Sequence, residues 1–147
     1  MSTNFSFINL EKEKRLIELQ HKVDSLSKEY SDLGVEIFFD EDNVEDFSIH
    51  IAKTCAGWKT LFQKTEYYES VKQIEEFYKA NIQKYEIRNI YGDVYTWQEF
   101  VDNVIDFNKD DDACLRHCDV SQSGERFIDM SYSVDEQGYC FSSREFC

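Results

Sequence analysis

The residues best suited to chemistry lie between His50 and Trp58, where the chain reads HIAKTCAGW. From Ser48 to Thr65 there are three lysines and no acid, within a chain whose formal net charge is -14. An imidazole, ammonium groups and an indole ring can together hold a phosphate or a nucleotide by charge and stacking. We therefore take as candidate ligand-binding residues His50, Lys53, Thr54, Trp58 and Lys59.

Other interpretations of this segment are weaker or structural. A Walker phosphate loop needs the spacing GxxxxGK[ST] before a helix, and no glycine stands at the required place. Cys55 and His50 resemble a thiolate and its base, but the sequence indicates no third residue to orient them, so we predict no catalytic residue. The favoured interpretation is a hairpin turn with solvated lysines and with Trp58 in the core.

Cysteines near the C-terminus raise the question of a metal site. Cys114, His117, Cys118 and Cys140 are soft ligands of the kind that zinc prefers. A C-x3-C pair without a second closely spaced pair is weak evidence, and free thiols are the usual state in a reducing compartment. We predict no metal and no cofactor, and zinc binding by these four residues stays open.

Charge limits the partners. Acids outnumber bases thirty to sixteen, which disfavours direct binding to nucleic acid or to an anionic membrane. The excess either keeps the protein soluble or imitates a phosphate backbone and contacts a basic surface on another protein. The candidate partner-binding residues are Asp40, Glu41, Asp42, Glu45, Asp46, Asp110, Asp111 and Asp112. Without an apolar run of about 18 residues or a signal-peptide layout, we expect a cytoplasmic protein with no membrane contact.

A helix is predicted from about Leu10 to Tyr30, because apolar residues recur there every three or four positions. Its stripe, formed by Leu16, Leu19, Val23, Leu26 and Tyr30, is as narrow as a coiled-coil seam. We expect this helix to pack on the sheet of its own chain, with a homodimer through the helix as the alternative.

Changes in the spacing of the apolar residues predict the remaining helices and strands. A hairpin is predicted from Val35–Phe39 and Phe47–Ala52, with His50, Ser48 and Ala52 on the face opposite Phe47, Ile49 and Ile51. The remaining predictions are a strand over 58–63, a helix over 69–85, a strand over 87–91, a helix capped by Thr96 and Glu99, and strands over 128–134 and 139–141. Together they indicate one α+β domain over 1–147 with a mainly antiparallel sheet, ordered as N-terminal helix, β-meander, two helices and C-terminal hairpin.

Three blocks carry a resemblance to a known family: HIAKTCAGW, YGDVYTWQEF (91–100) and GYCFSSREF (138–146). They resemble a widespread family of small proteins of tailed bacteriophages and other viruses, whose first and third blocks read HIGKSSxGW and GYxFSxxEF. The resemblance runs from about Phe47 to the C-terminus and leaves out residues 1–33, predicted as an amphipathic helix. The chain departs from the pattern at Ala52, Thr54 and Cys55. The resemblance implies a viral origin and brings no activity.

Three possible functions remain, of which the third is a structural role in the virus. The first is a non-enzymatic viral accessory protein in the host cytoplasm, which binds and inhibits a host protein such as a defence or nucleic-acid-handling enzyme. The alternative is a small-ligand binder or hydrolase, which requires His50, Lys53 and Trp58 to converge with Tyr139 or Glu145. A viral assembly component that associates through the N-terminal helix is the third.

Overall fold

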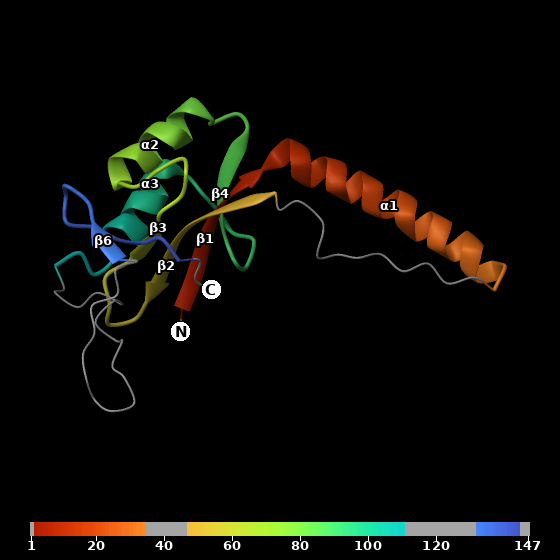
Figure 1. Ribbon diagram of the computed structural model, residues 1–147, viewed down its shortest axis with the longest axis horizontal. Helices are drawn as coiled ribbons and strands as arrows, with labels where there is room; N and C mark the ends of the chain where they lie inside the picture. The colour runs from red at the N-terminus through yellow and green to blue at the C-terminus, as the bar shows by residue number, and fades with distance from the viewer. Residues whose placement is uncertain (1, 35–46, 111–131, 145–147) are drawn as a thin grey trace.

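The computed structural model describes residues 2–34, 47–110 and 132–144 (Figure 1). It is a mixed α/β fold with a seven-stranded, mostly antiparallel sheet and three helices. In chain order the elements are β1 (Ser2–Asn9), α1 (Leu10–Asp32), β2 (Ser48–Cys55), β3 (Leu61–Gln63), α2 (Val71–Ala80), β4 (Tyr85–Asn89), β5 (Val94–Tyr95), α3 (Trp97–Phe100), the π-helical turn η2 (Val101–Ile105), β6 (Tyr132–Val134) and β7 (Cys140–Ser142).

The sheet has the strand order β5-β4-β1-β2-β3-β7-β6. β3 and β7 run parallel, and the other neighbouring pairs are antiparallel. β1 lies inside the sheet between β4 and β2, so the prediction that residues 1–33 form only a helix is wrong for residues 2–9. The alternation of Phe5 and Phe7 with polar residues is a strand pattern. The prediction missed this strand because the helical pattern that begins at Leu10 follows it without a break.

The helix predicted from Leu10 to Tyr30 is confirmed as α1, which runs to Asp32. The side chain of Asn9 caps it by accepting a hydrogen bond from the backbone N–H of Lys12 at 3.1 Å. However, none of its residues is buried, and α1 projects away from the sheet (Figure 1). The predicted packing of α1 on the sheet is therefore wrong. The apolar face of the sheet is covered by α2, α3 and η2, so no apolar strand surface remains for α1 there.

β2 contains an irregularity that changes the predicted faces. Phe5 lies opposite Ala52 and Ser6 lies opposite His50, which leaves Ile51 as the extra residue of a β-bulge. Ile51 and Ala52 are both fully buried. The prediction that Ala52 shares the outer face with His50 is therefore wrong, because the bulge interrupts the alternation on which it depended.

The core lies between one face of the sheet and the helices α2, α3 and η2. Its fully buried side chains include Phe7, Phe62, Tyr68, Ile74, Phe100 and Phe141. α2 is shorter than the predicted helix over 69–85: Ser70 caps its start, Asn81 follows its end, and the chain enters β4 at Tyr85. The capping box of Thr96 and Glu99 at the start of α3 is confirmed.

The C-terminal hairpin is confirmed for β6 and β7, which pair around a turn at Asp135 to Gly138. β3 begins at Leu61, three residues later than predicted. The predicted strand over 35–39 and the first half of the predicted strand over 128–134 lie outside the described residues.

Candidate functional site

The turn in the middle of HIAKTCAGW joins β2 to β3. The backbone N–H of Trp58 donates to the carbonyl of Cys55 at 3.2 Å, which closes a four-residue turn. Gly57 has a φ of 84°, a left-handed conformation that glycine adopts without steric cost. The turn is thus built as the sequence predicted, and the residues after it lead toward the only pair of parallel strands among the described residues.

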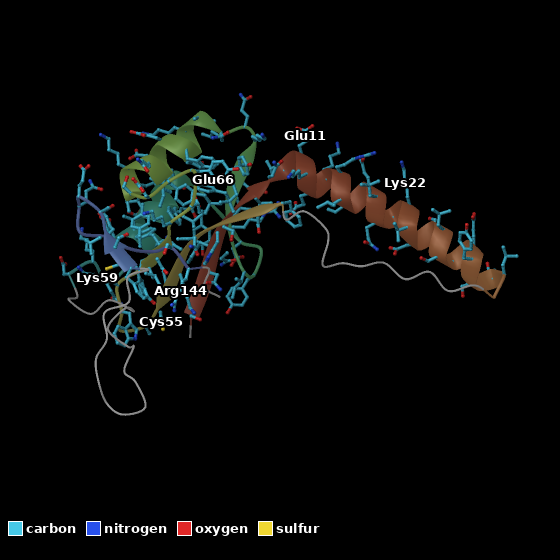
Figure 2. The ribbon with its side chains drawn as sticks, in the orientation of Figure 1. Glu11, Lys22, Cys55, Lys59, Glu66 and Arg144 are labelled. Atoms are coloured by element: carbon cyan, nitrogen blue, oxygen red, sulfur yellow. The ribbon has the colours of Figure 1, made fainter. Side chains whose placement is uncertain are left out.

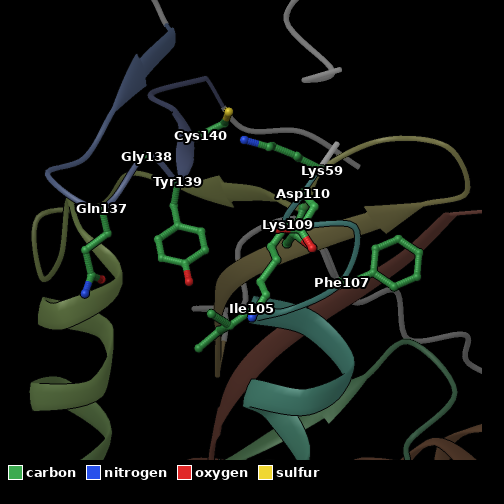
Figure 3. Close-up of a pocket in the computed structure, with 10 residues that line it drawn as sticks. Lys59, Ile105, Phe107, Lys109, Asp110, Gln137, Gly138, Tyr139 and Cys140 are labelled. Carbon is green, nitrogen blue, oxygen red and sulfur yellow. The ribbon is translucent and has the colours of Figure 1, made fainter. Parts of the chain in front are cut away.

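A pocket of about 190 Å³ lies beyond this turn (Figure 3). It brings together three segments: the start of β3, the end of η2 with the residues after it, and the turn before β7. The lining residues are Lys59, Thr60, Ile105, Phe107, Lys109, Asp110, Gln137, Gly138, Tyr139 and Cys140. Its lining combines hydrogen-bond donors (lysine ammonium groups, a phenol and an amide) with the apolar side chains of Ile105 and Phe107, which suits a small polar ligand.

The charges around Tyr139 are mixed. Burial raises the pKa of the Tyr139 phenol, and the nearby carboxylates of Asp106 and Asp135 raise it further, while Lys109 opposes them. Tyr139 therefore keeps its proton at neutral pH and acts as a donor, and Figure 3 shows its hydroxyl pointing toward Ile105. Lys109 also lies 3.7 Å from a carboxylate oxygen of Asp106, so part of its charge is balanced. Lys59 is the lining cation for which no such ion pair is seen within the described residues.

Two side-chain hydrogen bonds to the backbone fix the pocket walls. The Thr60 hydroxyl donates to the carbonyl of Val104 at 2.6 Å, which ties the start of β3 to η2. The Asn108 amide donates to the carbonyl of Trp58 at 3.1 Å, and Asn108 has a φ of 50°. Asparagine tolerates this left-handed conformation better than most residues, and here it turns the chain so that Lys109 comes to the pocket.

The predicted ligand-binding residues do not all meet. Lys59 and Tyr139 line the pocket, together with Asp110 from the predicted partner-binding set. His50, Lys53, Thr54 and Trp58 are not among the lining residues, so the predicted convergence of His50, Lys53 and Trp58 with Tyr139 does not form. Three of them lie on β2, which pairs with β1 and β3, whereas the pocket lies between the residues before β3, those after η2 and the turn before β7.

Trp58 differs from its predicted environment, and Thr54 is almost fully buried. Trp58 is half-buried and belongs to neither core cluster, so its assignment to the core is wrong. Thr54 is 8% exposed, within β2. The other predicted site residues lie outside the described part of the chain: Asp40, Glu41, Asp42, Glu45, Asp46, Asp111, Asp112 and Glu145.

The positions of the cysteines in the structure limit the reactions that they can take part in. Cys55 pairs with Ser2 and His50 pairs with Ser6, so the two share a face of the sheet but stand about 13 Å apart along it, too far to form a nucleophile pair. Cys140 is disulfide-bonded, which corrects the expectation of a free thiol there, and Cys55 is free. Cys114, His117 and Cys118 lie outside the described residues; among those described, no three His, Cys, Asp or Glu side chains gather as metal ligands.

Sequence reasoning missed Lys109 and Gln137 as pocket residues. Gln137 approaches Lys59 through the parallel pairing of β3 with β7, which joins residues about eighty positions apart, and Lys109 through the hydrogen bonds that tie Val104 and Asn108 to the start of β3. Local periodicity carries no information about such pairings. The turn around Gly138 was the one local signal, since it marked a chain reversal next to Tyr139.

Protein-family models, curated proteins and solved structures were all compared with this chain, and none of them matches it. Over the described ranges, no helix combines the length and the apolar character needed to cross a bilayer; α1 is long enough but carries charges along its whole length.

Proposed function

We propose that this protein is a non-enzymatic viral accessory protein that binds a basic surface on a host protein and inhibits that protein. The observation that carries the proposal is the distribution of charge. The described residues hold 18 acids and 14 bases, so that part of the chain is close to balanced in charge. The remaining residues, 35–46, 111–131 and 145–147 with Met1, hold 12 acids and two bases.

Solubility requires only a net charge away from zero on a surface of mixed sign, whereas this chain concentrates its excess of acids in a few segments. The segment 35–46 has six acids and no base, and it directly follows the projecting helix α1. Concentrated negative charge raises the rate of encounter with a basic surface and selects against acidic partners. The viral resemblance in three sequence blocks supports a host protein as the target.

Affinity capture from host-cell lysate tests the proposal. Changing Asp40, Glu41, Asp42, Glu45 and Asp46 to their amides should abolish capture of the target, and the wild-type complex should dissociate with salt and with competing duplex DNA. A control variant has the same change of net charge, made at exposed acids elsewhere: Glu11, Glu18, Asp24, Asp32 and Glu76. Equal capture by both variants, or a complex indifferent to salt and DNA, contradicts the proposal.

The pocket supports a second candidate, a small-ligand binder that uses Lys59 and Tyr139. Its donors suit a phosphate group more than a cation, although Asp110 reduces the positive charge. A panel of nucleotides and inorganic phosphate should then raise the melting temperature of the protein, because a ligand of the native state adds stability. The Lys59→Met variant should lose that shift. If no compound in the panel stabilises the wild type, the pocket is not such a site.

A further inference from the structure

The exposed face of α1 carries a heptad seam. Leu16, Leu19, Val23, Leu26, Tyr30 and Leu33 follow one another at alternating steps of three and four. Several of these side chains face solvent: Leu19 is 40% exposed, Leu26 is 48% exposed and Leu33, just past the helix, is 79% exposed. Apolar residues repeated every 3.5 positions on average form the contact line of a coiled coil, and within the described residues nothing covers this line.

The seam fits a helix better than a sheet. Two apolar positions in seven give a narrow contact line, whereas a helix that packs on a globular surface needs a wider stripe. α1 projects from the domain, with only its first turns tied to the sheet (Figure 1). Another helix can therefore lie along its length, roughly 35 Å, without contact with the sheet of the same chain.

The charges beside the seam specify a second copy of α1 in antiparallel orientation. When Val23 packs against Leu26 of the second copy, Leu19 meets Tyr30 and Leu16 meets Leu33, so every apolar layer is filled. In this register Lys22 flanks the seam opposite Glu29 of the other helix, and the symmetry produces the pair twice. Within the described residues neither Lys22 nor Glu29 has an ion pair, and Figure 2 shows Lys22 extending into solvent.

A parallel arrangement fills the apolar layers as well but lacks the charge pair. It would place Lys22 opposite Ser27 and Glu29 opposite Gly34, which gives no charge pair. It would also bring the two sheets together at one end, because each sheet is joined to the start of its α1. The antiparallel arrangement places the sheets at opposite ends of the helix pair.

We propose that α1 forms an antiparallel two-stranded coiled coil with α1 of a second copy, centred between Val23 and Leu26. The pairing does not use the acidic segment 35–46. The amide variant of that segment therefore stays dimeric, and loss of target capture and loss of dimerisation are separate outcomes.

Analytical ultracentrifugation of the full chain tests the seam. The wild type should sediment as a dimer at micromolar concentration, and Leu26→Glu should sediment as a monomer, because it places a carboxylate in both central layers. Ile17→Glu is the matched control: Ile17 is 53% exposed on the same helix but lies outside the seam, so this variant stays dimeric. A monomeric wild type, a larger oligomer, or a dimer that survives Leu26→Glu overturns the proposal.

A charge exchange tests the orientation. Lys22→Glu places two glutamate pairs across the interface and Glu29→Lys places two lysine pairs, so each single variant should weaken the dimer about ten-fold. The double variant K22E/E29K restores both attractions and should recover most of the affinity, with the effect reduced at high salt. If the single variants match the wild type, or the double variant is weaker than both, the helices are not antiparallel in this register.

Discussion

The guanidinium of Arg88, in β4, donates hydrogen bonds to both carboxylate oxygens of Glu13, in α1; the contact from Nη2 to Oε1 is 2.9 Å. The same guanidinium donates to Glu86 through Nε at 3.0 Å. Hydrogen bonding to Glu13 raises the pKa of Arg88 above its already high value, so it stays charged. This contact ties the base of the projecting helix to the sheet.

Replacing Arg88 with methionine should therefore destabilise the protein. The change leaves Glu13 and Glu86 close together without their shared cation, and we expect a loss of about 1–2 kcal/mol in the free energy of unfolding. Urea denaturation measures it. Lys79→Met removes an exposed helix pair with Glu75 and should cost less than about 0.5 kcal/mol. Equal losses in both variants would mean that Arg88 contributes no more to stability than the exposed Lys79.

Phe7→Ala tests whether β1 is part of the folded domain. The Phe7 side chain is fully buried, and its ring centroid lies 5.1 Å from that of Phe77 and 6.1 Å from that of Tyr68. Removing this ring should cost about 3–5 kcal/mol, a large share of a small domain's stability. Circular dichroism during thermal melting measures the loss. Ile90→Ala, at a side chain 56% exposed, should melt close to the wild type; a stable Phe7→Ala variant would show that β1 is dispensable.

Tyr68→Phe tests the hydrogen bond between the side chain of Tyr68, which precedes α2, and the backbone of β2. The Tyr68 hydroxyl donates to the carbonyl of His50 at 2.6 Å, and Tyr68 is 1% exposed. The phenylalanine variant leaves that carbonyl without this donor, at a cost of about 1–2 kcal/mol. Chemical denaturation at neutral pH measures the difference. A variant as stable as the wild type would show that another donor reaches the carbonyl.

The same tyrosine should make stability depend on alkaline pH. Burial raises the pKa of Tyr68 far above the ordinary value, so the folded protein keeps a proton that the unfolded chain releases. Its contribution is therefore complete below about pH 10 and decreases above it, by up to about 1.4 kcal/mol per pH unit. Unfolding measured across this range should show a shallower decrease for Tyr68→Phe than for wild type. Tyr91→Phe, at a 62% exposed side chain, should follow the wild type; parallel curves for all three proteins would contradict the assignment.

Asp135 should stabilise the pocket wall. Its carboxylate accepts backbone N–H bonds from Val71 at 2.9 Å, from Gln137 at 3.0 Å and from Tyr139 at 2.9 Å, which links the start of α2 to the turn before β7. Asp135→Ala should cost about 2–4 kcal/mol, and Asp135→Asn less, because an amide oxygen can still accept two of these bonds. Urea denaturation measures both. Glu136→Ala, at the exposed neighbouring residue, is the control, and a loss there as large as in Asp135→Ala would contradict this role.

The sequence by itself determined the elements whose forces are local. The helix from Leu10, the capping box of Thr96 and Glu99, and the turn at Gly57 depend on side chains within a few residues of one another. The mainly antiparallel sheet also followed, since period-two alternation and turn residues are local patterns.

Only the tertiary structure decided which segments meet. The bulge at Ile51, the place of β1 inside the sheet and the parallel pairing of β3 with β7 depend on contacts between distant residues. For that reason Lys59 lines the pocket together with Lys109 and Tyr139, and His50 is not among the lining residues. The seam of α1 shows the same division: its spacing is readable in the sequence, but its exposure follows from a sheet face already covered by other helices.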